Sequence, residues 1–268
     1  MRPFRRTHSQ SLRWVTAILL AALVLAACGG APAAAPTATP APTATPTPLP
    51  TPTPEPQPEP TATLEPEQEA MAVPTPQVTI PSGFGARVDD VRGYSLALPR
   101  GWTDLDLRSS QFQSMANTFG LGEQLGPLNE FLATPEGESI GIVAMTDLAA
   151  VMFGGLPTLL NVSVIDAPGV TPEMLVDFLA ANIEANQSAL GDVTIESLEA
   201  DTINNLPGVR GVVVADLSQV GMDAQLYAEV VGLIANDKVY VLTLATPEDG
   251  RAAKEPIFAQ IIGTFRPE

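Results

Sequence analysis

A segment rich in proline, threonine and alanine covers residues 30–77 and decides how much of this chain can fold. Its 48 residues include runs such as Thr51-Pro-Thr-Pro54-Glu55-Pro56. Too little apolar surface is available here to offset the entropy lost on ordering, and the closely spaced prolines hold the backbone in the polyproline II conformation. We therefore expect a disordered stalk, which reaches about 150 Å when fully extended.

A second interpretation of this segment is a ligand for a module that binds proline-rich peptides. Such ligands usually carry Arg or Lys beside the prolines, and residues 30–77 contain neither. The stalk interpretation is therefore preferred, and the folded part of the chain is limited to residues 78–268.

The first 27 residues have the three parts of a secretory signal. The basic start contains Arg2, Arg5 and Arg6, and an uncharged run of fourteen residues follows over 14–27. A helix that crosses a bilayer core needs about 20 apolar residues, and this run is shorter. It leads into the pentapeptide Leu25-Ala26-Ala27-Cys28-Gly29. The pentapeptide resembles the lipobox of bacterial lipoproteins, which implies cleavage before Cys28 and fatty acylation of its sulfur.

Cys28 is the only cysteine of the chain, so no disulfide framework exists for it to join. The alternatives are an ordinary secretory signal with an incidental cysteine, or an uncleaved signal anchor. The lipobox is a specific match because it needs a leucine three residues before the cysteine, small residues between them and an apolar run upstream. We expect Cys28 to be lipidated and residues 28–77 to link the anchor to the folded domain.

The chain is strongly acidic, with 13 basic and 30 acidic residues. Cleavage before Cys28 removes four arginines and leaves nine basic residues, for a formal net charge of −21. We expect no nucleic-acid partner, because the phosphate backbone is recognised by clustered Lys and Arg, and no such cluster exists. Anionic headgroups repel the same charge, so acyl chains must hold the protein at the lipid bilayer.

Residues 78–268 have the composition of one folded domain, with periodic runs of Val, Ile, Leu and Phe. Apolar and polar residues alternate over 94–98, and a Pro-Arg-Gly turn then precedes Trp102, which predicts a strand and a tight connection to a second strand. Helical spacing predicts short helices after Ser109 or Ser110 and after Pro127. Apolar runs over 140–145 and 158–165 predict two further strands.

The strongest helix signal begins at Thr171, a favourable N-cap, with Pro172 at the first helical position. One apolar stripe follows, and the helix is predicted to end near Gly191. The stripe consists of Leu175, Phe178, Leu179 and Ile183.

Strand-like runs follow over 193–201, 209–216 and 224–234, and a tight hairpin at Asn236-Asp237 joins the last of them to residues 239–244. A terminal helix is expected to close at Gly263. Its buried side is predicted to hold Ile257, Phe258, Ile261 and Ile262. Consecutive hairpins with helices between them predict an α+β fold, a mostly antiparallel sheet flanked by helices in an αβα sandwich.

The order of these elements resembles the PsbP-like family, which is named for an extrinsic photosystem II subunit and includes bacterial lipoproteins of the LpqN and DcrB type. The resemblance rests on the element over 94–102, the amphipathic helix in mid-chain, the hairpin through Tyr240 and the ending Thr264-Phe265-Arg-Pro267. It implies an αβα sandwich over most of residues 90–267 and a non-enzymatic accessory role. The insertion over 103–159 departs from the simplest form of the family.

Few residues that do nucleophilic or metal chemistry remain after cleavage. His8, the only histidine, leaves with the signal, and Cys28 is consumed by the lipid. This excludes Ser-His-Asp and Cys-His catalysis and zinc sites built from His or Cys. Glycine-rich phosphate loops are absent from the sequence. We expect no catalytic residue, no metal and no cofactor.

Carboxylates are the remaining candidate groups. Asp104 and Asp106 are two residues apart on an expected strand and would share a face, which suits Ca²⁺ or an acid/base pair, whereas Asp89-Asp90 and Glu136-x-Glu138 fall in expected loops. We interpret them as a solvated acidic surface, because none lies in the Asp/Asn loop with glycine that an EF-hand needs. Trp102 is interpreted as a core anchor and not as a ligand-stacking residue.

The sequence thus predicts a lipoprotein on the extracytoplasmic face of the cell membrane, with three hypotheses for its folded domain. The first is a non-enzymatic binding or assembly module for an envelope protein. The second is a carrier of a small apolar ligand, suggested by the Gly-, Ala- and Leu-rich residues 148–160. The third is a carboxylate-dependent hydrolase, which requires an Asp/Glu pair about 5 to 10 Å apart and which the loss of His and Cys disfavours.

Overall fold

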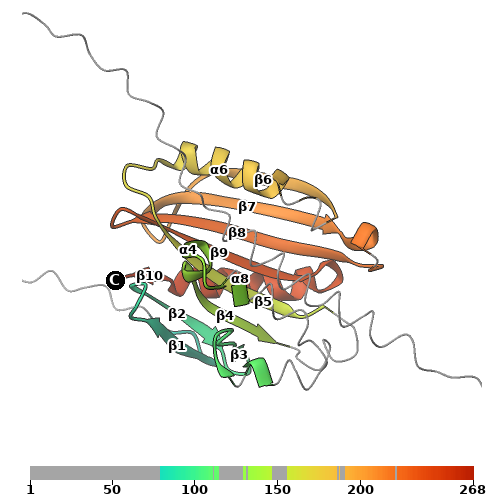
Figure 1. Cartoon of the computed structure of the whole chain (residues 1–268), viewed down its shortest axis with the longest axis horizontal. Helices are drawn as coiled ribbons and strands as arrows, with labels where there is room; N and C mark the ends of the chain where they lie inside the picture. Colours follow the sequence, from blue (N-terminus) through green and yellow to red (C-terminus); the bar gives the residue numbers. More distant parts are fainter. Residues whose placement is uncertain are drawn as a thin grey trace, which may run out of the picture. The chain divides into compact units, whose positions relative to one another are not determined.

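A seven-stranded antiparallel sheet forms the centre of the fold (Figure 1). The computed structural model describes residues 79–110, 112–114, 129–130, 132–146, 156–185, 187, 191–220 and 222–268. Across the sheet the strand order is β3, β4, β5, β9, β8, β7, β6. The bounds of these strands are β3 Thr103–Asp104, β4 Ile140–Thr146, β5 Thr158–Asp166, β6 Asp192–Ile203, β7 Leu206–Asp216, β8 Gln225–Ala235 and β9 Lys238–Pro247.

Two-residue turns connect the long strands in one half of this sheet. The backbone φ is positive at Asn204 (55°) and Asn205 (64°) between β6 and β7, and at Asn236 (54°) and Asp237 (58°) between β8 and β9. Positive φ at both central residues is the mark of a type I′ turn, whose twist matches that of the flanking strands. The hairpin predicted at Asn236-Asp237 is confirmed, and the structure adds a second one at Asn204-Asn205.

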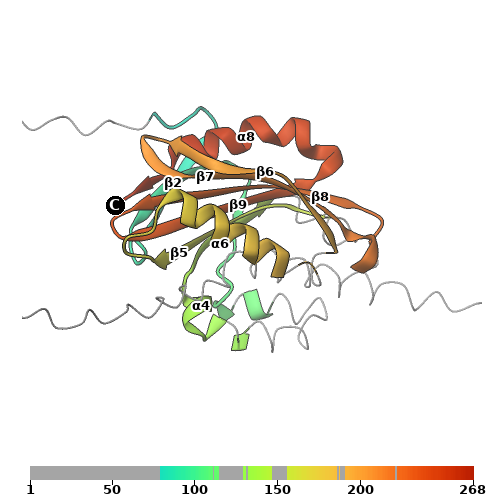
Figure 2. The ribbon, with the colours of Figure 1, turned by 90° about the horizontal axis from the view of Figure 1, so that it is seen from above.

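The two faces of the sheet are covered by different elements (Figure 2). Helix α6 (Pro172–Ala185) lies on one face and helix α8 (Arg251–Thr264) on the other. A three-stranded antiparallel sheet packs with α8 on the second face, in the order β1 (Phe84–Asp89), β2 (Tyr94–Pro99), β10 (Arg266–Pro267). Short helices complete the described elements: α4 Pro135–Glu138, η1 Leu217–Val220 and η2 Glu248–Gly250. The fold is α+β, a mostly antiparallel sheet flanked by helices.

Helix α6 begins where its sequence predicts. The Thr171 carbonyl accepts the N–H of Leu175, and the Thr171 hydroxyl accepts the N–H of Met174 at 3.4 Å. Pro172 occupies the first helical position, where its missing N–H costs no intrahelical hydrogen bond.

One side of α6 packs closely on the sheet. Leu175, Leu179 and Ile183 are buried there, as the apolar stripe predicts. Gly232 of β8 lies beneath the helix, and a Cβ at this position would come within 2.7 Å of Leu175 Cδ2. The missing side chain at Gly232 therefore lets the helix approach the strand.

Helix α8 ends one residue later than predicted, at Thr264 rather than Gly263, because Phe265 is the first residue with an extended backbone. The Thr264 hydroxyl accepts the N–H of Ala97 at 2.9 Å and donates to the Ile261 carbonyl at 2.7 Å. These two hydrogen bonds tie the end of the helix to β2.

Aromatic rings join the small sheet to the large one. Tyr94 of β2 stacks on Phe265 with ring centroids 5.6 Å apart, and both rings contact Tyr240 of β9 edge-on. Trp102 is 8% exposed and packs in the same core, which confirms its interpretation as a core anchor.

Several predictions concern residues outside the described part of the chain. These include the signal over 1–27, the linker over 28–77 and most of the two short helices after Ser109 and Pro127. Ser109 does cap the described start of the first helix, because its Oγ accepts the N–H of Phe112 at 3.1 Å. In the described ranges, no helix has the length and apolar character needed to cross a membrane.

Candidate functional site

Charged side chains gather on the α8 side of the sheet, over strands β6, β7 and β8. We call this set the acidic face, and it combines six carboxylates with two guanidinium groups. Its members are Glu196, Glu199, Asp201, Arg210, Glu229, Glu248, Arg251 and Glu255.

A β-bulge decides which β6 side chains reach this face. The register between β6 and β7 shifts between Ile195 and Ser197. Ile195 and Leu198 are three residues apart, yet both pack in the core on the α6 side. Strict alternation would place them on opposite faces, and the extra residue of the bulge restores them to the same one. As a result Glu199 lies opposite Arg210, on the α8 side.

Arg210 neutralises the most buried carboxylate of the acidic face. Its guanidinium lies 2.6 Å from Glu229 Oε1 and 3.4 Å from Asp201 Oδ2. The Glu229 side chain is only 8% exposed. Burial raises the pKa of Glu229 because the charged form is desolvated, and Arg210 opposes this rise. Glu229 is thus a buried acid that depends on one arginine for compensation.

Arg251, at the start of α8, connects three other carboxylates. Its guanidinium lies 3.1 Å from Glu196 of β6, 3.4 Å from Glu248 and 2.8 Å from Glu255. It also sits over the Tyr227 ring, 4.4 Å from the centroid, in a cation–π contact. Burial first, and then the nearby Glu229 and Glu255, raise the pKa of Tyr227 to about 12.

Carboxylates outnumber cations on this face by six to two. Both arginines already contact several acids, and Glu199 is exposed and has no ion pair within the described part of the chain. The face therefore keeps an excess of negative charge on rigid strands, which suits the recognition of a positively charged partner.

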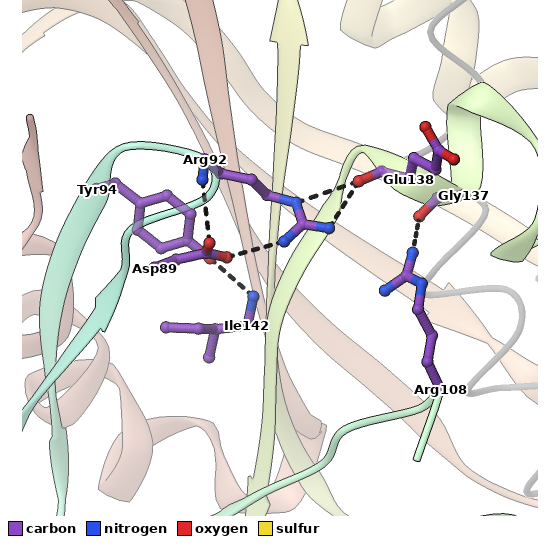
Figure 3. Close-up of polar contacts among 7 residues, drawn as sticks. All are labelled: Asp89, Arg92, Tyr94, Arg108, Gly137, Glu138 and Ile142. Carbon is purple, nitrogen blue, oxygen red and sulfur yellow. Dashed lines mark hydrogen bonds and ion pairs between the residues drawn. The ribbon is translucent and has the colours of Figure 1, made fainter. Parts of the chain in front are cut away.

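A second polar cluster lies where the small sheet meets β4 (Figure 3). The Tyr94 hydroxyl oxygen accepts the N–H of Ile142 at 2.7 Å, and Asp89 accepts hydrogen bonds from the backbone N–H and the guanidinium of Arg92. Tyr94 is fully buried. Burial raises the pKa of its hydroxyl well above the usual range, against the lowering effect of the Ile142 hydrogen bond.

Two arginines of this cluster hold the end of α4. Arg92 donates twice to the Glu138 carbonyl, at 3.1 and 2.7 Å, and Arg108 donates to the Gly137 carbonyl (Figure 3). Cations at the last carbonyls of a helix satisfy acceptors that have no partner in the helix itself. We interpret the Tyr94 cluster as a structural clamp between β1–β2 and the α4–β4 segment.

The structure separates the carboxylates that the sequence placed together. Asp104 forms an ion pair with Arg87, whereas Asp106 lies beyond β3 and accepts the N–H of Arg108. The expectation that Asp104 and Asp106 share one strand is therefore wrong, because β3 ends at Asp104.

Most of the other predicted site residues either have structural roles or lie outside the described part of the chain. Asp89 belongs to the clamp, and Glu138 contributes its carbonyl to the same clamp. In the resolved ranges no group of three His, Cys, Asp or Glu residues is arranged to hold a metal ion. Cys28 and its neighbours Leu25, Ala26, Ala27 and Gly29 lie outside the described residues.

The acidic face is not among the features predicted from the sequence. Glu229 is the only charged residue of the β8 run 225–235, and a lone acid in an otherwise apolar strand is a signal for a compensated buried charge. Arg210 is likewise the only basic residue of β7. Arg210 and Glu229 come into contact only through the register between β7 and β8, which cannot be read from the sequence.

Comparison with known proteins finds likeness at the level of structure. No protein-family model matches the chain, and no curated protein sequence matches it. The chain resembles the solution structure of cyanobacterial PsbP (CyanoP) from Synechocystis, with a TM-score of 0.47, 14% identity, and coverage of 70% of this chain and 94% of CyanoP. It also resembles the Ran-binding protein Mog1p of Saccharomyces cerevisiae, with a TM-score of 0.41, 10% identity, and coverage of 68% and 94%. These two likenesses concern the fold and not a shared activity.

Proposed function

We propose that this protein is a lipoprotein, anchored through Cys28 on the extracytoplasmic face of the cell membrane, whose PsbP-like domain is a non-enzymatic binding or accessory module. The anchor is supported by the lipobox over 25–29, and the stalk by the composition of residues 30–77. An acidic domain on such a stalk meets its partner beyond the headgroup region, where the negative lipid charge does not compete.

The observation that carries the binding role is the arrangement of charge on the acidic face. The buried Glu229 pairs with the partly exposed Arg210, and Arg251 is fixed by three carboxylates and by the Tyr227 ring. These contacts hold the underlying strands in one geometry, so the exposed Glu199 and Asp201 are presented without a large ordering cost on binding. The partner class is a protein with a basic surface.

The anchor is tested by fatty-acid labelling of cells that express the wild-type chain or Cys28→Ser. Label is expected on the wild type alone, with the wild-type protein in the membrane fraction. Equal labelling of both chains contradicts the lipid anchor.

The binding role is tested by co-purification from solubilised membranes. A variant with Glu199→Lys and Asp201→Lys is compared with a control of equal charge change on α6, Asp177→Lys with Glu184→Lys, all four residues being exposed. One partner is expected with the wild type and with the α6 control, and is lost from the β6 variant. Equal recovery from all three proteins would show that the acidic face does not bind it.

A further inference from the structure

Strand β6 is an edge of the seven-stranded sheet, and within the described part of the chain no strand pairs with its outer side. Among the described residues it pairs with β7 alone, through all of its residues except Glu196 in the bulge. Beyond the bulge, residues 197–203 pair with β7 in regular register up to the Asn204-Asn205 turn. Such an exposed edge is a template for pairing with another extended chain.

The turn determines which β6 groups point outward. Ile203 and Leu206 flank a two-residue turn, so they form a hydrogen-bonded pair, and the pattern alternates from there. Asp201 and Glu199 therefore bond to β7, whereas the peptide groups of Thr202, Ala200 and Leu198 face away from it. The Thr202 N–H is bonded to Asp201 Oδ1 at 2.7 Å.

Two residues thus offer both a donor and an acceptor to a further strand. These are Leu198 and Ala200, for which the described residues provide no outer backbone partner. Ala200 and Thr202 are exposed and Leu198 is half-buried, so solvent reaches this stretch of the strand. The open groups are spaced as a β-ladder requires.

The charge next to this edge favours one kind of incoming strand over another. Glu199 and Asp201 flank Ala200, and both face the acidic side of the sheet. A second copy of β6 would bring these carboxylates against its own, and like charges placed across strands are destabilising. An incoming strand with Lys or Arg at the same face gains attraction instead.

We propose that β6 binds an extended segment of a partner protein by strand addition, and that this segment carries Lys or Arg at alternate positions. The basic side chains lie beside Glu199 and Asp201, and the side chains between them are small or apolar because they lie beside Leu198 and Ala200. This inference rests on the proposed binding function and names the form of the partner.

The probe is a synthetic nine-residue peptide of alternating lysine and valine, added to the full-length protein in detergent. Binding is measured by calorimetry, together with hydrogen exchange at the Leu198 and Ala200 amides. We expect binding that weakens with salt and slower exchange at these two amides. Binding that leaves their exchange unchanged overturns strand addition.

Two N-methylated peptides separate strand addition from simple charge attraction. One peptide is methylated at the backbone nitrogen of every valine, and the other at the backbone nitrogen of every lysine. The lysine side chains are unchanged, so the two peptides carry the same charge. In a ladder only one of these sets faces β6, so one peptide binds and the other fails. Equal binding by both peptides overturns strand addition while leaving charge recognition by the acidic face intact.

Variants of the protein provide the matched test. Ala200→Pro removes only an outward N–H, which an edge strand tolerates, and it is expected to weaken peptide binding by about tenfold or more. Ala200→Val keeps the N–H and is expected to bind as the wild type does. Loss of binding in both variants, or in neither, contradicts the proposal.

A peptide of alternating glutamate and valine tests the underlying function separately. It is expected not to bind. If it binds as well as the lysine peptide, charge recognition by the acidic face is wrong, and with it the basic character of the proposed segment.

Discussion

Replacing Gly141 tests whether the Tyr94 cluster is a rigid clamp. A Cβ at position 141 would overlap the Tyr94 hydroxyl oxygen and would lie 2.9 Å from Asp89 Oδ2. The Tyr94 ring cannot move aside freely, since it is fully buried between Phe265 and Tyr240. We expect Gly141→Ala to lower the free energy of unfolding by about 1 to 3 kcal/mol, the usual cost of overpacking a core.

A second substitution isolates the cause of this loss. Tyr94→Phe removes the acceptor of the Ile142 N–H and is expected to cost about 1 to 2 kcal/mol. In the double variant the hydroxyl that overlaps the new Cβ is gone. The free energy of unfolding of the double variant should therefore fall by less than the sum of the decreases in the two single variants. The difference should be about 1 kcal/mol or more.

The assay is urea unfolding of the wild type, both single variants and the double variant, followed by far-ultraviolet circular dichroism. The coupling energy is the difference between the double loss and the sum of the single losses. Additivity within about 0.3 kcal/mol, or a Gly141→Ala variant as stable as the wild type, would refute the clamp.

Three further predictions concern single side chains. Because burial raises the pKa of Glu229, the folded state holds the Glu229 proton more tightly than the unfolded state does. Protonation therefore stabilises the fold, and this stabilisation is lost as the pH rises through the raised pKa. Urea titrations at several pH values should thus show Glu229→Gln gaining stability relative to the wild type above about pH 4.3, the ordinary glutamate pKa; a constant difference at all pH values would contradict this. Asp237→Gly should raise the free energy of unfolding by up to about 1 kcal/mol, because glycine adopts the positive φ of this turn without strain; thermal unfolding measures the change, and a loss would argue against turn strain. Thr264→Val leaves the buried Ala97 N–H without an acceptor and should cost about 1 to 3 kcal/mol in urea unfolding, whereas Thr264→Ser, which keeps the hydroxyl, should cost clearly less; equal losses would exclude the hydrogen bond as the cause.

Local signals in the sequence predict the elements well where the chemistry is local. Thr171-Pro172 fixes the start of α6, and Asn236-Asp237 forms the expected turn because both residue types tolerate positive φ. The end of α8 was misplaced by one residue, since Gly263 continues the helix and Phe265 ends it. Glycine favours a helix end only where a positive φ is needed there, and no such φ occurs at Gly263.

Features that depend on distant pairing could not be predicted. Strand β10 has two residues and pairs with Tyr94 and Ser95, far away in the sequence. The bulge near Glu196 changes which side chains share a face, and no local residue pattern marks it. Contrary to expectation, Asp104 and Asp106 do not share a strand, because β3 ends at Asp104.

The candidate site shows the same division. Glu229 is visible in the sequence as a lone acid among apolar residues, but Arg210 becomes its partner only through the β7–β8 pairing. The open edge of β6 likewise follows from the strand order and not from composition. Site prediction therefore needed the sheet topology in addition to the residues.

The most direct test of this account is site-specific photo-cross-linking in growing cells. A photoreactive residue replaces Ala200 on the β6 edge or, as a control, Met174, which is 48% exposed on α6. We predict that position 200 captures one envelope protein through a segment with Lys or Arg at alternate positions, and that position 174 does not. Equal capture at both positions, or no capture at position 200, would contradict binding at the edge beside the acidic face.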